Sequence, residues 1–320
     1  MKQLFKYLPE PRDIFDDGFI RLSQVAALND PFEASFCKAS LDELSSHFDE
    51  SSAYDTKFGQ ISFSDYVKIK IHHIGVISFS ENKENLLMWA HYANEHKGLI
   101  AGIAQHRDFS IFHNLFRACT LINTLINTSF GNEFSPFDGV AKPVSYRKGL
   151  RYRNDKFDND YSNICVEGAD RILYEVFMQK SDEWIYEQEH RVVLRLEQAD
   201  RVIINSIEDI ENIKIRNLLS TNPNVSIDQS TGRCTVDLWL FDDENLRIAV
   251  AINLVELSTN PSSIFLMKLS ASSINNCLIG LNSKLQKQNV LDGHANSVGY
   301  LDVWKAKKNN DYYSLEFIEI

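Results

Sequence analysis

The chain has 320 residues, of which 44% are hydrophobic and 24% are charged, so it can bury a core and has the composition of an ordinary globular protein. Its formal net charge of −11 argues against broad, nonspecific binding to nucleic acid or to anionic lipid, although a local basic groove is compatible with it. No stretch approaches the length of a membrane span, and residues 1–12 lack the apolar core of a signal peptide, so we expect a cytoplasmic protein with no membrane partner.

Strand and helix patterns alternate through the first two thirds of the chain. Short apolar or alternating runs predict strands at residues 4–8, 19–22, 75–80, 99–103, 140–146 and 186–196. Helical patterns lie between them, at residues 40–73, 85–97, 107–127 and 169–179. Gly98 stands where a glycine commonly ends a helix, directly after the pattern over 85–97.

The composition and the hydrophobic pattern of the segment 200–262 differ from those of the residues before it. Residues 205–230 are polar, and two alternating runs, 236–241 and 246–254, predict a β-hairpin. We therefore expect 200–262 to be an insertion that carries a surface particular to this protein. The whole chain, 1–320, is predicted to form a single α+β domain, with a mixed sheet, flanking helices and this inserted β-hairpin segment.

Cysteine and histidine spacing gives no sign of a metal or disulfide site. The five cysteines are scattered without a Cys-x-x-Cys pair, and the nine histidines do not form a His-x-x-x-His pair. We expect reduced thiols and no bound metal.

The most informative stretch for function is Glu187-Gln188-Glu189 with Arg191. On the strand predicted over 186–196, alternate side chains share a face, so Glu187, Glu189 and Arg191 would lie together, with the two carboxylates about 7 Å apart. Chemistry that needs an acid, a base or a stabiliser of positive charge would explain two neighbouring carboxylates. An exposed edge strand with salt-bridged Glu and Arg explains them equally well.

Four segments carry a resemblance to a known family. They are Phe5-Lys6-Tyr7, residues 28–33 (LNDPFE), residues 75–98, which include GVISFS and LMWAHYA, and residues 180–191, which include Lys180-Ser181 and YEQE. In order and spacing they resemble the bacterial family known as domain of unknown function 2971, over roughly residues 4–196. The chain is similar to the abortive-infection protein AbiGi, a phage-resistance factor, which implies a role in antiviral defence.

The order of a basic residue, a Ser-x-Ser strand and a Glu-x-Glu motif also resembles the ADP-ribosyltransferase fold. That resemblance implies that NAD is the substrate, for ADP-ribosyl transfer or NAD hydrolysis. Glu189 would stabilise the positive charge that develops on the ribose, and Glu187 would orient or deprotonate the acceptor. The strands predicted over residues 4–8, 75–80 and 186–196 should then lie in one region of a sheet, with their polar residues at one mouth.

The same resemblance implies a set of NAD-contacting residues: Lys6, Tyr7, Ser78, Ser80, Trp89 and Tyr92. Ser78 would bind the ribose, Ser80 would help to position the glutamate, and Tyr92 or Trp89 would stack on the nicotinamide. Two positions depart from the pattern. Phe79 replaces the usual small hydroxyl residue, and Lys6 is a poorer bidentate phosphate ligand than arginine.

Other interpretations remain open at this point. Met88, Trp89 and Tyr92 have the spacing of a helix that simply packs against a core. A metal-dependent nuclease would gather one Mg²⁺ on Asp30, Glu187 and Glu189, although the downstream lysine of common nuclease cores is missing. A noncatalytic sensor would use the aromatic helix as a pocket wall. The acceptor of any transfer could be a protein, a nucleic acid or a small molecule.

Overall fold

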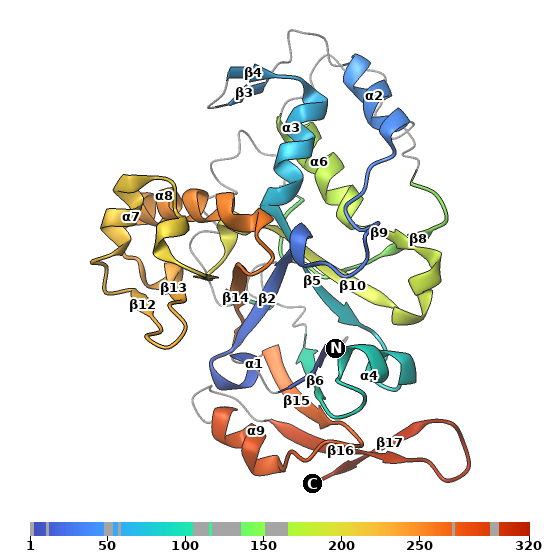
Figure 1. Ribbon diagram of the computed structural model, residues 1–320. Coiled ribbons are helices and arrows are strands. Elements are labelled where there is room, and N and C mark those ends of the chain that lie inside the picture. The colour runs from blue at the N-terminus through green and yellow to red at the C-terminus, as the bar shows by residue number, and fades with distance from the viewer. Residues whose placement is uncertain are drawn as a thin grey trace.

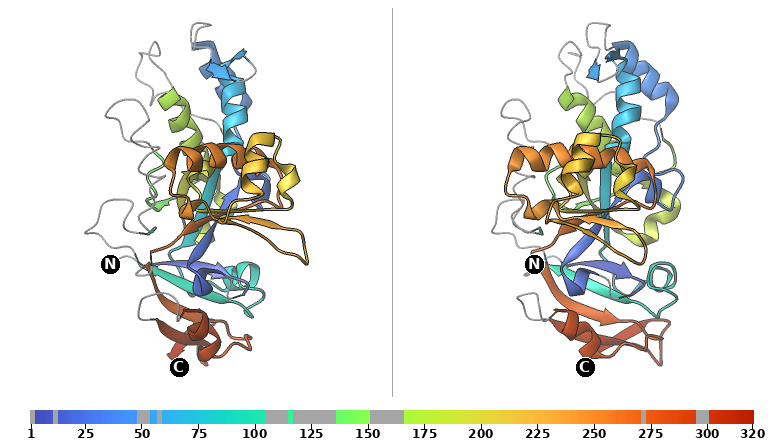
Figure 2. Two further views of the ribbon diagram at one scale, coloured as in Figure 1. Left: turned by 90° about the vertical axis from the view of Figure 1, so that its left-hand side faces the viewer. Right: turned by 60° about the vertical axis from the view of Figure 1, so that its left-hand side comes forward.

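The computed structural model describes residues 3–10, 13–47, 54–56, 59–104, 115–116, 136–150, 166–270, 273–294 and 301–320. The helix predicted over 107–127 lies outside these residues, apart from Leu115 and Phe116. The molecule is elongated in all three ribbon views (Figures 1 and 2). Three helices, α2, α3 and α6, lie at one end, a C-terminal hairpin lies at the other, and a large sheet lies between them.

The fold is α+β, with one large mixed sheet. The helices of the described residues are α1 (Asp13–Asp16), α2 (Lys38–His47), α3 (Phe63–Lys70), α4 (Leu86–Tyr92), α6 (Val166–Phe177), α7 (Ile213–Leu219), α8 (Glu244–Val255) and α9 (Lys287–His294). The 13-stranded sheet contains β1 (Gln3–Leu8), β2 (Phe19–Gln24), β5 (Ile74–Ser80), β6 (Leu99–Ala104), β7 (Lys142–Pro143), β10 (Glu189–Arg195), β11 (Arg201–Ile204), β12 (Val225–Ile227), β13 (Cys234–Val236), β14 (Ile264–Lys268), β15 (Ile274–Ile279), β16 (Asp302–Lys308) and β17 (Leu315–Glu319). Two short pairs lie apart from it: β3 (Tyr54–Thr56) with β4 (Gly59–Ile61), and β8 (Ser145–Arg147) with β9 (Gln179–Ser181).

Strand β5 is the junction of the sheet. On one edge it pairs with β10 along its whole length, from Ile74 to Ser80. On the other edge it pairs with β2 only at Gly75 and Val76, and with β1 only at Ser80. The sheet continues from β2 through β14 in one direction and from β1 through β6 in the other. Strands β1 and β2 therefore diverge from the same edge of β5, and no described strand pairs with that edge between Val76 and Ser80.

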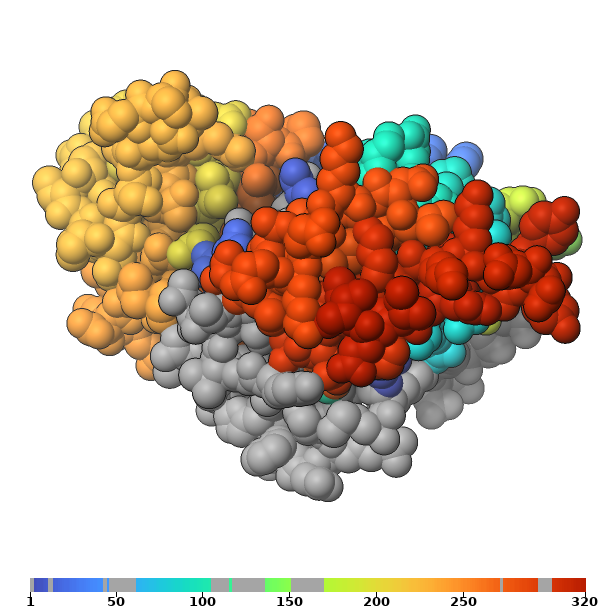
Figure 3. All heavy atoms as spheres, turned by 90° about the horizontal axis from the view of Figure 1, so that it is seen from below, coloured from blue at the N-terminus to red at the C-terminus, as the bar shows by residue number. Residues whose placement is uncertain are grey.

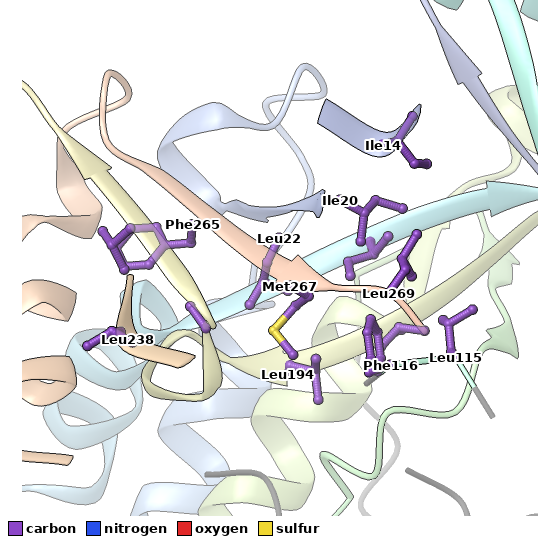
Figure 4. Packing of buried hydrophobic residues seen from close by; sticks show 14 of the residues in the cluster. Ile14, Ile20, Leu22, Leu115, Phe116, Leu194, Leu238, Phe265, Met267 and Leu269 are labelled. Atoms are coloured by element: carbon purple, nitrogen blue, oxygen red, sulfur yellow. The ribbon is translucent and has the colours of Figure 1, made fainter. Parts of the chain in front are cut away.

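Apolar side chains pack around this junction. Leu22 of β2, Leu194 of β10 and Met267 of β14 belong to the largest buried cluster, shown in Figure 4. A second cluster lies beneath α4 and contains Tyr7 and Trp89. The Trp89 ring is fully buried, packs edge-on against Tyr7 at 5.6 Å between centroids, and donates from Nε1 to the Lys83 carbonyl at 2.8 Å.

Replacing Trp89 by phenylalanine should lower the free energy of unfolding by about 1–3 kcal/mol, because the Lys83 carbonyl loses its donor and part of the ring volume is left empty. Urea unfolding measures this change. Tyr313→Phe is the control, because Tyr313 is fully exposed and should change stability by less than about 0.5 kcal/mol. Equal stability of the Trp89→Phe variant and the native chain would show that helix α4, which carries Trp89, does not anchor the sheet.

The helix predicted over 85–97 is shorter than expected. It ends at Tyr92, and Asn94, Glu95 and His96 then adopt positive φ angles of 48°, 54° and 66°. These turns bring the chain back so that β6 can pair with β1. Gly98 does not cap the helix but packs on β1, where a Cβ atom would lie 2.2 Å from the Leu8 carbonyl oxygen.

The hairpin predicted over 236–254 is wrong in both halves. Strand β13 ends at Val236 and a 3-10 turn follows at Leu238–Leu240, and residues 244–255 form helix α8. Asp243 caps this helix by accepting from the Leu246 amide. The buried side chains follow a helical period, at Arg247, Val250, Ala251, Leu254 and Val255. A hairpin does occur in the segment 200–262, between β12 and β13.

The segment 200–262 extends the main sheet at one end. Its strand β11 pairs with β14 and with β13, so its backbone is continuous with the sheet. Val202, Ile204 and Val250 contribute to the same buried cluster as Leu194. Viewed from below, the segment projects to one side of the C-terminal face (Figure 3).

Candidate functional site

A cavity of about 190 Å³ lies where β1 and β2 diverge from β5. It is bounded by these strands, by α4, by the loop that follows β2 and by the segment that leads into β10. All but one of the site residues expected from the sequence line it: Lys6, Tyr7, Ser78, Ser80, Tyr92, Glu187 and Glu189. Trp89 does not line it, because its ring is enclosed in the core beneath α4.

The two glutamates reach the cavity from different local structures. Glu187 is the last residue of the 3-10 helix η7 (Asp182–Glu187), and β10 begins only at Glu189. Gln188 between them has a left-handed backbone with φ 45° and ψ 50°. The prediction of one strand over 186–196 is therefore wrong at its start. Glu187 owes its position to this turn rather than to strand alternation.

Both carboxylates nevertheless meet at one ammonium group. Lys180 Nζ donates to Glu187 Oε2 at 2.6 Å and to Glu189 Oε2 at 3.0 Å. It also lies 3.2 Å from Glu33 Oε1. The side chain of Lys180 is 5% exposed, so water screens these contacts poorly.

Arg191 completes the network from the same face of β10 as Glu189. Its guanidinium donates to Glu189 Oε1 at 2.7 Å, to Glu33 Oε1 at 2.7 Å and to the Phe177 carbonyl at 2.7 Å. The expected Glu–Arg pairing is present, but the strand is not an exposed edge, because Arg191 is 0% exposed and β10 pairs with both β5 and β7. Loss of one charged partner from a buried network of this kind destabilises the fold severely.

These contacts fix the charge states. Burial on its own would raise the pKa of Glu189, but the charges of Arg191 and Lys180, with hydrogen bonds from Arg191 and the Ser78 side chain, lower it to about 2. Burial would lower the pKa of Lys180, but the charges of Glu189 and Glu33 outweigh it and hold that pKa above its ordinary value. Glu189 is therefore a carboxylate, and Lys180 an ammonium, throughout the neutral range.

The depressed pKa of Glu189 predicts acid sensitivity. The folded state holds this carboxylate at a pKa of about 2, against 4.5 for an unperturbed glutamate. Its contribution to stability is thus fully present above pH 4.5 and is lost as the pH falls towards 2, by on the order of 3 kcal/mol. Urea unfolding at successive pH values from neutral to acidic measures this loss. The Glu189→Gln variant should lack this part of the pH dependence, and identical slopes in both proteins would refute the assignment.

Hydroxyl groups hold Glu187 and the turn after it. Tyr92 Oη donates to Glu187 Oε1 at 2.6 Å, and burial together with this bond raises the pKa of Tyr92. Ser80 Oγ donates to the Glu187 carbonyl at 2.7 Å. Ser80 thus positions the backbone of the Glu-x-Glu turn. Tyr7 Oη is turned to the Asn82 carbonyl, at 2.6 Å.

Lys180 and Glu33 matter here but were not among the catalytic or NAD-contacting residues predicted from the sequence. Both belong to the segments that carried the family resemblance, and this was the available signal. Their convergence depends on three separate elements, the loop after β2, strand β9 and strand β10. Short-range spacing cannot report such an arrangement.

The metal interpretation expected Asp30, Glu187 and Glu189 to share one cation. Three carboxylates do converge, but they are those of Glu33, Glu187 and Glu189, and the Lys180 ammonium lies among them. Asp30 Oδ1 instead accepts from the Phe32 amide at 2.9 Å. Within the part of the chain that the structure describes, no group of three or more His, Cys, Asp or Glu side chains is arranged to hold a metal ion.

Comparison with known proteins gives a partial match. The family model described as a protein of unknown function (DUF2971) matches residues 88–192, about a third of the chain. The matched range contains Tyr92, Glu187 and Glu189, but neither Lys6 nor the Ser-x-Ser strand. No curated protein and no solved structure matches the chain. None of the described helices is both long and apolar enough to cross a membrane.

Proposed function

We propose that the cavity binds the nicotinamide–ribose end of NAD and that the protein consumes NAD, by transferring ADP-ribose to an acceptor or to water. The observation that carries this proposal is that Lys6, Ser78, Ser80 and Glu189 share one cleft at the divergence of β1 and β2. A metal-dependent nuclease would instead require carboxylates free to bind a cation, and here the Lys180 ammonium lies among them.

The reaction needs a group that tolerates positive charge on the ribose. When the bond between ribose C1′ and nicotinamide N1 breaks, both bonding electrons go to N1, and the ribose becomes an oxocarbenium ion. A fixed carboxylate in a water-poor site stabilises such a charge strongly. Glu189 suits this role, because its pKa of about 2 keeps it ionised and Arg191 fixes its position.

Glu187 suits the second half of the reaction. As the acceptor oxygen or nitrogen forms its bond to C1′, it must lose a proton, and a carboxylate within hydrogen-bond reach can accept it. Glu187 Oε1 accepts from Tyr92 and Oε2 from Lys180, so both of its oxygens are held in place at the cavity wall. In this proposal the acceptor replaces one of these two partners.

The remainder of the dinucleotide has space beside the cavity. Ligand pockets typically measure about 300–1,000 Å³, so the cavity, of about 190 Å³, would enclose only one end of NAD. A second cavity of about 260 Å³ adjoins it and shares Asp30, Glu33 and Lys180 with it. Arg147 and Lys148 line this second cavity, and we place the diphosphate near them.

Incubation of the purified protein with NAD⁺, with and without cell lysate, tests the proposal. We expect mass spectrometry to detect free nicotinamide in both reactions, and ADP-ribose adducts on lysate components if transfer occurs. Failure to release nicotinamide under either condition would end the proposal. Cleavage of nucleic acid that a chelator abolishes would favour the nuclease instead.

Replacing Glu187 by glutamine should separate transfer from hydrolysis. If Glu187 activates the acceptor, the variant should lose adduct formation by on the order of 10²-fold, and it should lose NAD hydrolysis less. The ratio of labelled adduct to free ADP-ribose measures this partition. Glu183→Gln is the matched control, because Glu183 lies on the same 3-10 helix but is exposed. An unchanged ratio in Glu187→Gln would remove Glu187 from the acceptor step.

A noncatalytic NAD-binding role is the second candidate, and one observation favours it. Glu189 already accepts two hydrogen bonds from Arg191 and one from Lys180, as a purely structural carboxylate would. A sensor of this kind would bind NAD, raise the melting temperature of the protein and release no nicotinamide. The incubation experiment therefore separates the two candidates.

We further propose that NAD consumption serves antiviral defence, as the expected similarity of the sequence motifs to an abortive-infection protein implies. Depletion of NAD would stop the growth of an infected cell before phage are released. Expression of the chain during phage infection should therefore lower both cellular NAD and phage yield. Normal NAD levels alongside protection from phage would separate defence from this chemistry.

A further inference from the structure

Two lysines, Lys6 and Lys180, line this cavity, and their contacts differ. Lys6 Nζ donates to the Ser78 carbonyl oxygen at 3.0 Å. Ser78 lies on the stretch of β5 where, on the edge that β1 and β2 share, no described strand pairs with it. Lys180 binds three carboxylates, whereas Lys6 forms no salt bridge within 4.0 Å among the residues that the structure describes. Its amine is thus held at the cavity wall by one backbone carbonyl.

The environment of Lys6 lowers the pKa of its amine, so a larger fraction is neutral than in an exposed lysine. Burial is the main cause and lowers the pKa of Lys6 to about 8; the charge of Glu189 acts to raise it, and that of Arg21 lowers it further. At pH 7 about one tenth of Lys6 is then neutral, against about one in 2,500 for an exposed lysine of pKa 10.4. A neutral amine is the nucleophilic form, and desolvated lysines commonly act as Schiff-base nucleophiles.

We propose that Lys6 is an imine-forming amine and that the cavity takes small hydroxyaldehydes, the class to which an open-chain sugar belongs. The carbonyl carbon would lie at Nζ of Lys6, and the hydroxyl groups would face the polar wall formed by Ser78, Tyr92 and Glu189. This site goes beyond the proposed use of NAD and does not require it.

The step is balanced without a cofactor. The amine lone pair forms a bond to the carbonyl carbon, and the electrons of the C=O π bond move to the oxygen, which gains a proton. The nitrogen, having given up one proton, uses its lone pair to form the C=N bond as the C–O bond breaks, and the oxygen, protonated a second time, leaves as water. The protonated imine gives the neutral imine when it loses its last N–H proton, so one amine and one aldehyde give one imine and one water. Ionised Glu189 lines the same cavity, and its charge stabilises the protonated imine.

Reductive trapping tests the site. The native protein is treated with D-glyceraldehyde and sodium cyanoborohydride at pH values from about 6 to 10, and the modified lysines are mapped by mass spectrometry. We expect Lys6 to be modified at least about tenfold faster than Lys148 at pH 7, since the Lys148 side chain is 89% exposed to water. The rate at Lys6 should rise up to about pH 8 and then level off.

Lys6→Arg is the matched variant, because arginine keeps the charge and a donor for the Ser78 carbonyl but forms no imine under these conditions. It should lose the fast adduct while the slow adducts remain. Modification spread over exposed lysines, with Lys6 not preferred, would overturn the proposal, as would an unchanged fast adduct in Lys6→Arg. If the variant does not fold, the pH profile of Lys6 in the native chain decides the question. The result is independent of whether nicotinamide is released from NAD.

Discussion

Glu189→Gln should lower the rate of nicotinamide release by a factor on the order of 10²–10³, equivalent to about 3–4 kcal/mol of transition-state stabilisation. The amide keeps the shape of the side chain but removes the negative charge that the developing oxocarbenium ion requires. The effect should appear in kcat, with little change in the affinity for NAD, because the charge matters most in the transition state. Steady-state release of nicotinamide and equilibrium binding of NAD measure the two quantities separately.

A loss of stability has to be distinguished from this loss of rate. Glu189 neutralises both Arg191 and Lys180, so the glutamine variant should also be less stable, by on the order of 3 kcal/mol, as the loss of this charge at acid pH should be. A domain with the usual stability of about 5–15 kcal/mol would still be folded at 25 °C. Unfolding curves should therefore accompany the kinetics, with Glu183→Gln as the exposed control. Equal NAD turnover by the native and Glu189→Gln proteins would end the NAD hypothesis.

The same variant separates chemistry from binding in the cell. If NAD consumption causes toxicity or protection from phage, the Glu189→Gln variant should show neither effect when its cellular level is similar to that of the native protein. Protein abundance has to be measured, because a destabilised variant is often degraded. Full toxicity with Glu189→Gln would point to a partner-binding role.

Strand patterns predicted the sheet around the site well. The segments 4–8 and 75–80 are short runs of apolar or alternating residues, and both form strands close to their predicted bounds. Together with β10 they lie in one sheet, as expected. Period-two patterns survive in tertiary structure because each strand has to bury one or both faces. The order of the Ser-x-Ser and Glu-x-Glu motifs therefore predicted which strands would be close together.

Predictions failed where backbone conformation departs from periodic structure. Gln188 adopts the left-handed conformation. A glutamine does not predict this conformation, because glycine and asparagine are the residues that usually adopt it. Helix α4 ends early for a tertiary reason, the need to return to β1. Helix α8 was missed because apolar residues occupy both alternate and helical positions in residues 246–254.

The charge network could not be derived from local sequence. Lys180, Glu33 and Glu189 come from three elements, and the last two are far apart in the chain. Each residue alone looks like an ordinary surface charge. Their mutual burial follows only from the way in which β9, β10 and the loop after β2 come together.

Arg191→Met should lower the free energy of unfolding by about 3–5 kcal/mol, among the largest effects expected for a single substitution. Methionine fills much of the same space, so the loss is mainly electrostatic. Among the described residues, it leaves Glu189 and Glu33 with only Lys180 as a cationic partner, and it removes the Arg191 donor from the Phe177 carbonyl. The pKa of Glu189 should then rise, because the charge of Arg191 is the largest influence that lowers it.

A double-variant cycle distinguishes a coupled network from independent losses. In Arg191→Met combined with Glu189→Gln, neither of the paired charges remains, so we expect the double variant to be more stable than the sum of the single losses implies, by about 1–3 kcal/mol. Arg147→Met is the control, since Arg147 is exposed and its guanidinium bonds only the Ser145 hydroxyl among the described contacts. Strict additivity, or a cost for Arg191→Met no larger than that control, would mean that the buried charges do not act as one network. The positions of Glu187 and Glu189 would then have to be fixed by the backbone alone.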